Sequence, residues 1–426
     1  MKRLSLIIAL LAIVICGSYA KSSDKVILGD ERPQLYLPLL EGKRVALFSN
    51  QTGIVGDRIE NSLLPALTQT DDKTCRIPFL TPADSTKEVL LGAHILDALI
   101  AENIEVTTIF SPEHGFRGTA DAGERVGSSI DPKTGVPIVS LYDKNSPFKS
   151  DEILDSFDVL VVDIQDVGLR FYTYYISMYK LMNVCARAGK QVVVLDRPNP
   201  NGSYVDGPIL DMSLKSGVGG LPVPVVHGMT LGELALMIDG EGWLADGLKC
   251  KLTVIPMENY THAMNLNLIL PPSPNLKDMK AVLLYPSTCY FEGTVVSLGR
   301  GTLFPFEVYG HPDMKGCDFS FTPRSIPGAK NPVLLDRKCY GRDLRDKPID
   351  IILSEKLNFG YIIDAYEKLS VGDDFFLKNG FFELLSGQRW VRAEIEKGMG
   401  AEELSAKWRD DVLKFEEQRS RYLLYP

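Results

Sequence analysis

Apolar and polar positions along the chain form two kinds of run: short β-branched segments and longer segments with helical spacing. Residues 157–164 (FDVLVVDI) are almost continuously apolar, as expected for a parallel strand covered on both faces. Similar runs predict further strands at residues 44–49, 106–110, 136–142, 191–195 and 252–255. Helical spacing predicts helices at residues 88–102, 172–188 and 230–240. This alternation predicts an α/β fold with a Rossmann-like, doubly wound, mostly parallel sheet.

The pattern contains one clear helix start and one change in the kind of element that it predicts. Thr230 followed by Glu233 has the form of a capping box. After the proline-rich residues 271–275, residues 281–285 predict a strand, residues 289–312 look irregular, and helices dominate from residue 362. We therefore expect a Rossmann-like domain at residues 26–280 and a smaller, mixed α/β C-terminal domain at residues 281–426.

The first 20 residues have the order of a secretory signal. Lys2 and Arg3 precede an apolar stretch at residues 4–15, which is too short for a persuasive membrane span, and a small residue, Ala20, ends the segment. This order predicts export to the periplasm. Cys16 raises the alternative of a lipid anchor, although the bulky Ile15 before it is unusual for that signal.

Charge and cysteine content narrow the function classes. The net charge of −9 and the absence of a basic run argue against nucleic acid as a partner, and an anionic ligand would need locally placed arginines. None of the cysteines forms a CxxC pair, so a structural zinc site is not expected. Because an exported protein can form disulfides, Cys317 and Cys339, which share a loop-rich region, are the preferred pair.

The stretch at residues 104–118 (IEVTTIFSPEHGFRG) concentrates reactive side chains on one tight loop. A strand ends at Pro112 and delivers Glu113, His114 and Arg117 among glycines. In open α/β sheets, ligands bind beyond the carboxyl ends of the strands. The alternative is that Glu113 and Arg117 pair with each other and only fix the loop.

Other predicted strand ends also carry polar side chains. Any one of these residues is more often a structural hydrogen-bonding group than a functional one, but their repetition over five loops predicts a site. They are Asp163, Gln165, Asp166, Arg170, Tyr172, Asn199, Asn201, His227, Asn275, Glu292 and Arg300.

Several familiar site motifs are absent from the sequence. It lacks GxGxxG, a Walker lysine at the required spacing, GxSxG and HExxH, so we expect no nucleotide cofactor, no serine-hydrolase elbow and no metal. After these exclusions, the remaining class is chemistry carried out by carboxylates, with support from arginine, asparagine, histidine and tyrosine. Glycoside cleavage fits this inventory, because it needs one protonated carboxyl group, and Phe110 and Phe116 would desolvate Glu113.

Seven motifs that fall in order carry a family resemblance. They include FSPEHGFRGTADAGE, VVDIQDVGLRFYTY, LDRPNPNG, PVVHGMTLGELA and EGTVVSLGRGT. Together they resemble the exo-β-N-acetylmuramidases of glycoside hydrolase family 171. The resemblance implies a Rossmann-like domain and a smaller C-terminal domain with the site in the cleft between them. It also implies release of N-acetylmuramic acid from the non-reducing ends of peptidoglycan fragments. Residues 71–86 depart from the family by seeming longer and more irregular.

The resemblance also implies roles for individual residues. Glu113 would be the general acid and His114 its neighbour in the catalytic motif, with Arg117 and the other strand-end residues lining the sugar pocket. The second catalytic group stays open: Asp166 or Glu292 would activate water, or the 2-acetamido group of the substrate would act as nucleophile. Arg170 or Arg300 would hold the lactyl carboxylate of the sugar.

Two other classes of protein remain compatible with the residues. One is a non-catalytic protein that captures muropeptides or sugars in the same cleft. The other is a different hydrolase on the same sheet, such as an amidase or a phosphoesterase.

Overall fold

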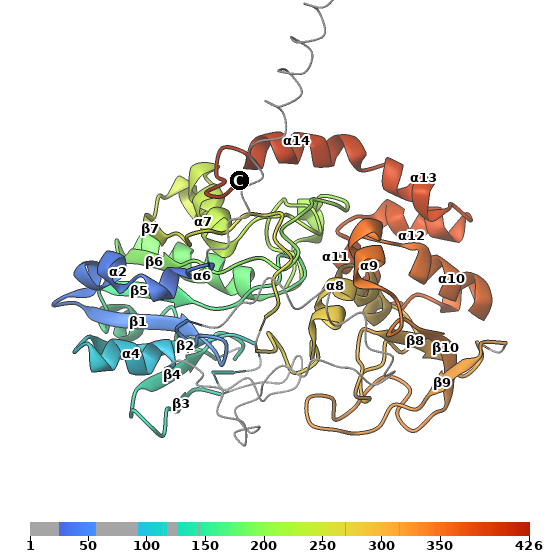
Figure 1. Cartoon of the computed structure of the whole chain (residues 1–426), viewed down its shortest axis with the longest axis horizontal. Coiled ribbons are helices and arrows are strands. Elements are labelled where there is room, and N and C mark those ends of the chain that lie inside the picture. Colours follow the sequence, from blue (N-terminus) through green and yellow to red (C-terminus); the bar gives the residue numbers. More distant parts are fainter. Residues whose placement is uncertain are drawn as a thin grey trace, which may run out of the picture.

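The computed structural model describes residues 25–56, 93–113, 115–116, 127–143, 145–268, 270–314 and 316–426. These residues form two lobes that lie side by side (Figure 1). The predicted signal at residues 1–20, the anchor candidate Cys16 and the irregular residues 71–86 lie outside the described residues. Among the described residues, no helix combines the length and apolar character that a bilayer crossing requires.

A seven-stranded sheet in the order β3-β4-β2-β1-β5-β6-β7 forms the centre of the large lobe. Every neighbouring pair in it is parallel except β3–β4. From β1 the chain builds outward to one side through β2 and β4, and then returns to place β5 on the other side of β1, which makes β1 the topological switch point. The strands are β1 (Arg44–Ser49), β2 (Glu105–Ser111), β3 (Ser129–Ile130), β4 (Pro137–Ser140), β5 (Val159–Asp163), β6 (Gln191–Leu195) and β7 (Lys251–Ile255).

Helices cover both faces of this sheet, as the doubly wound prediction required. Alternate residues of the buried strand β5 point to opposite faces. Val159 and Val161 pack in a core with α2 (Pro33–Leu40) and α4 (Ile95–Ala101). Leu160 and Val162 pack in a second core with α6 (Tyr174–Arg187) and α7 (Leu231–Gly240). The short elements of this lobe are η1 (Gly29–Glu31), α5 (Asp151–Asp155), η2 (Met212–Leu214) and η3 (Ala245–Gly247).

The small lobe combines a three-stranded antiparallel sheet, in the order β8-β10-β9, with a group of helices. Its core is continuous with the α6–α7 side of the large lobe, because Tyr175 and Tyr290 belong to one buried cluster. Its elements are α8 (Met279–Thr288), η4 (Cys289–Gly293), β8 (Val308–His311), β9 (Phe319–Phe321), β10 (Cys339–Asp343), α9 (Ile349–Glu355), α10 (Gly360–Leu369), η5 (Gly372–Asp374), α11 (Phe381–Ser386), α12 (Arg389–Glu396), α13 (Ala401–Ala406) and α14 (Arg409–Arg419).

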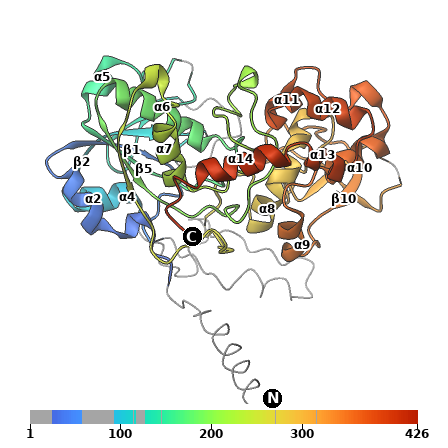
Figure 2. The same cartoon turned by 90° about the horizontal axis from the view of Figure 1, so that it is seen from above.

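The C-terminal segment returns to the large lobe. Helix α14 crosses from one lobe to the other (Figures 1 and 2), and Arg419 donates a hydrogen bond to the carbonyl of Gly228. The hydroxyl of Tyr425 donates to Asp196 at 2.7 Å, and the backbone N–H of Leu424 donates to Glu233 at 2.8 Å. The end of the chain therefore completes the large lobe.

Three local predictions can be compared with this fold. The capping box is confirmed, because Thr230 and Glu233 exchange hydrogen bonds at the start of α7. The strand predicted at residues 281–285 is wrong. This segment lies inside α8, which begins at the N-cap Asp278, and a run buried on every side gives no periodicity that separates strand from helix. The preferred disulfide is also wrong, because Cys317 and Cys339 are both free and Cys339 packs into the core of the small sheet.

Candidate active site

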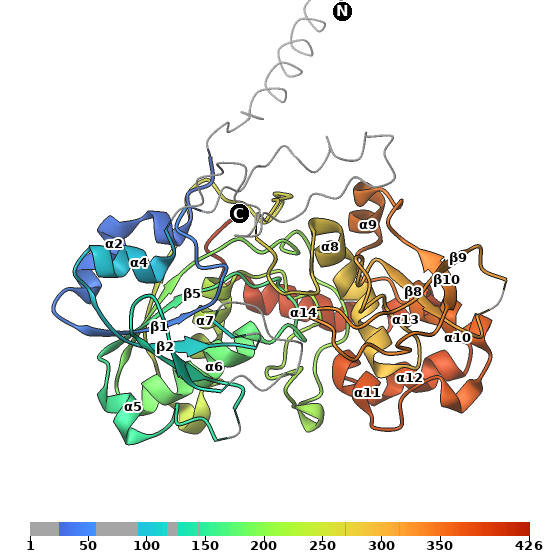
Figure 3. The ribbon, with the colours of Figure 1, turned by 90° about the horizontal axis from the view of Figure 1, so that it is seen from below.

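A cavity of about 290 Å³ lies where the two lobes meet, and both lobes contribute its walls. In the view from below, α6 of the large lobe and α8 of the small lobe stand on either side of this junction (Figure 3). The polar residues that line it include Glu113 and Thr173 from the large lobe and Asn275, Glu292 and Arg300 from the segments that follow. Two carboxylates and a guanidinium group therefore share one small space.

Strand β2 and a tight turn position Glu113. The strand ends at Ser111, and the backbone N–H of Gly115 donates to the carbonyl of Pro112 to close the turn. Gly115 has a φ of +77°, which a residue with a side chain rarely adopts. Phe116 is buried against the ring of His94 and anchors the far side of the turn. The half-buried Glu113 accepts a hydrogen bond from the hydroxyl of Thr173 at 2.9 Å on Oε2.

Glu292 and Arg300 reach the cavity as an ion pair from the small lobe. Nε and Nη2 of Arg300 both donate to Oε1 of Glu292, at 3.1 and 2.5 Å. The guanidinium group lies over the ring of Phe306 at 5.1 Å, and the glycines on both sides of Arg300 have positive φ values. The two side chains are 22% and 23% exposed, so the pair remains accessible from the cavity.

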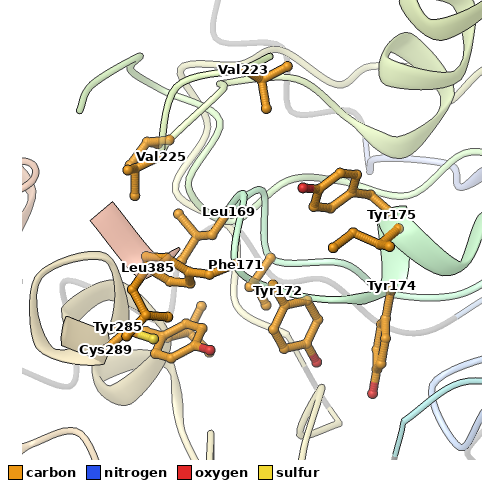
Figure 4. Packing of buried hydrophobic residues seen from close by; sticks show 14 of the residues in the cluster. Leu169, Phe171, Tyr172, Tyr174, Tyr175, Val223, Val225, Tyr285, Cys289 and Leu385 are labelled. Carbon is orange, nitrogen blue, oxygen red and sulfur yellow. The ribbon is translucent and has the colours of Figure 1, made fainter. Parts of the chain in front are cut away.

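Aromatic side chains form much of the remaining wall. The hydroxyls of Tyr172 and Tyr174 both donate to the carbonyl of Pro272 at 2.8 Å. Figure 4 shows these two hydroxyls pointing the same way, opposite to Val223 and Val225. Tyr285 packs edge-on against its aromatic neighbours Phe171, Tyr172 and Phe306. Burial raises the pKa of Tyr172, Tyr174 and Tyr285 well above 10, so all three hydroxyls stay neutral.

The structure brings five of the sequence-predicted site residues into this cavity: Glu113, Tyr172, Asn275, Glu292 and Arg300. Asn275 is itself held by a hydrogen bond from its side-chain amide to the carbonyl of Gly328. Two further predicted residues, His114 and Arg117, lie outside the described residues.

Two predicted charged residues are hydrogen-bonded in the protein interior and are not among the residues that line the cavity. Asp163 accepts hydrogen bonds from Arg197, which also pairs with Asp30 at 2.6 Å. Arg170 is fully buried, and its guanidinium group donates to the carbonyls of Pro208, Val223 and Leu385, so it ties the lobes together. Arg300 therefore remains as the candidate for an anionic sugar substituent.

Three of the predicted amide side chains, those of Gln165, Asn199 and Asn201, hold the loops beyond β5 and β6 and are not among the cavity residues. The side chain of Gln165 donates to the carbonyls of Asp166 and Pro198. Asn199 donates to the carbonyl of Met229, and Asn201 donates to that of Val167. Each of these amides supplies a partner that a buried backbone group requires.

His227 and Asp166 are buried titratable groups that are not among the residues lining the cavity. Burial, together with the charge of Arg419, lowers the pKa of His227 to about 3, so this imidazole is neutral. Burial raises the pKa of Asp166 to about 7, against hydrogen bonds from nearby backbone N–H groups. One of these comes from Gly168 at 2.8 Å, and another group, the N–H of Tyr175, lies in the first turn of α6. Asp166 thus places a hydrogen-bonding carboxyl group at the N-terminus of that helix.

Sequence analysis missed Thr173, Tyr285 and Phe306, which all line the cavity. Thr173 had no usable positional signal, because the helix predicted at residues 172–188 placed it inside the first turn, whereas α6 begins at Tyr174. Tyr285 and Phe306 had no such signal, since each reaches the cavity only through the packing of the small lobe. Among the described residues, no group of three or more His, Cys, Asp and Glu side chains could hold a metal ion.

Comparison with known proteins agrees with this geometry. The family model described as "Exo-beta-N-acetylmuramidase NamZ, N-terminal" matches residues 83–280, and the corresponding C-terminal model matches residues 283–425. The chain belongs to the NamZ family. The resemblance inferred from the seven motifs is therefore confirmed.

Individual relatives extend this assignment. The chain is 38% identical over 339 residues to "Peptidoglycan beta-N-acetylmuramidase NamZ" of Bacillus subtilis, which covers 76% of this chain and 80% of the relative. Two crystal structures of DUF1343 family proteins from Bacteroides fragilis each cover 94% of this chain and 99% of their own. One is 51% identical with a TM-score of 0.80, and the other is 25% identical with a TM-score of 0.68. The predicted α/β fold class is confirmed by these neighbours.

Proposed function

We propose that this NamZ-family glycosidase removes N-acetylmuramic acid from the non-reducing ends of peptidoglycan fragments, with Glu113 as the general acid. The observation that carries this proposal is the cavity in which Glu113 of one lobe and the Glu292–Arg300 pair of the other share an aromatic-walled space. Glycoside hydrolysis needs two carboxyl groups around one glycosidic bond. The curated relative is named for this activity on peptidoglycan.

In this mechanism, Glu113 donates its proton to the glycosidic oxygen as the bond to the leaving sugar breaks. Glu292 is the better candidate for the second group than Asp166, because Glu292 lines the cavity whereas Asp166 is buried against α6. The alternative for the second group is the 2-acetamido oxygen of the substrate.

Arg300 suits the lactyl carboxylate that distinguishes N-acetylmuramic acid from N-acetylglucosamine. Its Nε and Nη2 atoms hold Glu292, which leaves Nη1 and the second hydrogen of Nη2 as a fork for another carboxylate. Stacking on Phe306 fixes the plane of that fork.

Turnover of a chromogenic N-acetylmuramide, measured beside the matching N-acetylglucosaminide, tests the function. We expect hydrolysis of the muramide and a 10²- to 10⁴-fold loss of kcat in Glu113→Gln. The matched control is Glu105→Gln, which alters an exposed carboxylate at the opposite end of the same strand and should keep full activity. Ligand binding without turnover by the wild-type protein would favour the non-catalytic alternative. The first-formed product anomer, followed by NMR, distinguishes retention from inversion.

A further inference from the structure

Thr173 stands directly before α6, at the position where threonine usually caps a helix by accepting a hydrogen bond from a backbone N–H group. Its hydroxyl makes no such bond to the helix. It donates instead to Oε2 of Glu113 at 2.9 Å, across the interval between β2 and α6. A threonine at a position typical of a helix cap thus donates its hydrogen bond to a carboxylate that lines the cavity.

Helix α7 provides an internal comparison, because Thr230 occupies the same position before it. The hydroxyl of Thr230 accepts a hydrogen bond from the N–H of Glu233 and donates to Asp196. Glu233 completes the box by accepting from the N–H of Thr230. Thr230 therefore caps its helix and Thr173 does not, while the carboxyl group of Asp166 accepts a hydrogen bond from the N–H of Tyr175 at the start of α6.

The surroundings of Thr173 hold its backbone in place. Its carbonyl accepts hydrogen bonds from both the backbone N–H and the hydroxyl of Ser177, at 3.1 and 3.3 Å. The tyrosines on both sides of it are anchored to the carbonyl of Pro272. The hydroxyl of Tyr142, at the end of β4, lies beside Thr173 and Ser177. A hydroxyl carried by a backbone held in this way can select one orientation of a carboxyl group.

We propose that Thr173 is a positioning residue for Glu113: its hydroxyl holds Oε2 and so fixes the orientation in which the carboxyl group meets the glycosidic oxygen. The inference rests on the proposed function of Glu113. Among the described residues, the titratable and charged groups near the carboxyl include Tyr142 beyond the end of β4, Tyr174 of α6, and Glu292 and Arg300 of the same cavity. The adjoining His114 and Arg117 lie outside the described residues.

The role predicts a specific pH effect. A hydroxyl that donates to the ionised carboxylate favours that form. Removing the hydroxyl makes the proton of Glu113 harder to lose, so the general acid persists to higher pH. The alkaline limb of the kcat/KM profile of Thr173→Val should therefore lie at higher pH than that of wild type.

Kinetics of Thr173→Val and Thr173→Ser test the proposal. Valine keeps the shape and removes the hydroxyl, and we expect kcat to fall about 10- to 100-fold, with a smaller change in KM, because the proton donor is misplaced. Serine restores the hydroxyl and should recover most of the rate and the wild-type profile. Thr230→Val is the matched control: it removes a helix cap, so it should lower the melting temperature more than Thr173→Val does and leave the pH profile unchanged.

Two results would overturn the role of Thr173. One is a Thr173→Val enzyme with the wild-type kcat and alkaline limb, and the other is a serine variant as impaired as the valine variant. A ¹³C NMR titration of the Glu113 carboxyl in wild type and Thr173→Val separates this proposal from the proposed function. If wild type turns over no muramide, the function fails, yet an upward shift of the titration midpoint in the variant still supports the hydrogen bond and an unchanged midpoint refutes it.

Discussion

Two polar clusters lie at the carboxyl edge of the large sheet, and they differ in what surrounds them. In the first, Arg197 joins Asp30 and Asp163, and these three side chains are 0–2% exposed. In the second, Glu292 and Arg300 face Glu113 across a cavity and are more than a fifth exposed. The residues of the first cluster all belong to the large lobe. The second cluster combines residues of both lobes around a cavity that remains open between them.

A charged residue at a strand end is therefore not by itself a site residue. The buried cluster joins η1 to the ends of β5 and β6, and a neighbouring carboxylate, Asp196, holds Tyr425 and Thr230. Buried charges of this kind are tolerated when they are paired and hydrogen-bonded. Their removal should therefore affect folding, while changes in the cavity should affect catalysis.

The largest expected effect on stability follows from Arg197→Met. This change leaves the two carboxylates of Asp30 and Asp163 buried without their shared cation, and we expect a loss of at least about 3–5 kcal/mol in urea unfolding. The molecules that remain folded should keep kcat close to wild type. Glu113→Gln should show the reverse, an unchanged unfolding midpoint with little activity. A stable Arg197→Met protein, or an unstable Glu113→Gln protein, would contradict the assignment of the buried cluster to folding and of the cavity residues to catalysis.

Asp166 should give the next largest effect, and it depends on pH. Its folded pKa of about 7 lies above the ordinary value of 3.8, so its contribution to stability is complete below about pH 3.8 and is lost as the pH rises through about 7. Asp166→Asn removes this loss, which is on the order of 4 kcal/mol when complete. The stability of the variant relative to wild type should therefore rise between pH 4 and pH 8.

Asp158→Asn provides the control for that experiment. Hydrogen bonds from Arg44 lower the pKa of Asp158 to about 2, so its contribution to stability is already present at pH 4 and stays constant up to pH 8. Urea unfolding of both variants at several pH values makes the measurement. If the difference in unfolding free energy between Asp166→Asn and wild type did not change with pH, this carboxyl group would not be held in its neutral form.

Arg300→Lys should produce the smallest of these changes and the most selective one. Lysine keeps the charge but loses the planar fork, so we expect the preference for the muramide over the glucosaminide to fall about 10- to 100-fold, measured as kcat/KM. Arg324→Lys alters an exposed pair with Asp336 and should leave both rates within about twofold. Full retention of rate and preference in Arg300→Lys would remove Arg300 as the group that reads the lactyl carboxylate.

The sequence predicted the large sheet well, because its strands are short β-branched runs and the capping box of Thr230 is a purely local signal. It failed at residues 281–285, since the burial that surrounds α8 on all sides comes from both lobes. Glu113, Glu292 and Arg300 were found because motifs place them at loop positions. Arg170 and His227 looked equivalent to them, because the sequence does not record whether a second lobe leaves an open cavity or fills it.

The return of α14 to the large lobe has a practical consequence for dividing the molecule. A fragment that stopped near residue 280 would lack Tyr425 and Leu424, and the buried carboxylates of Asp196 and Glu233 would lose those partners. The two matched family regions are therefore not two pieces that can be expressed apart and expected to stay folded. The same tie extends to Pro426, whose backbone oxygen accepts a hydrogen bond from the backbone N–H of His262 at 2.9 Å.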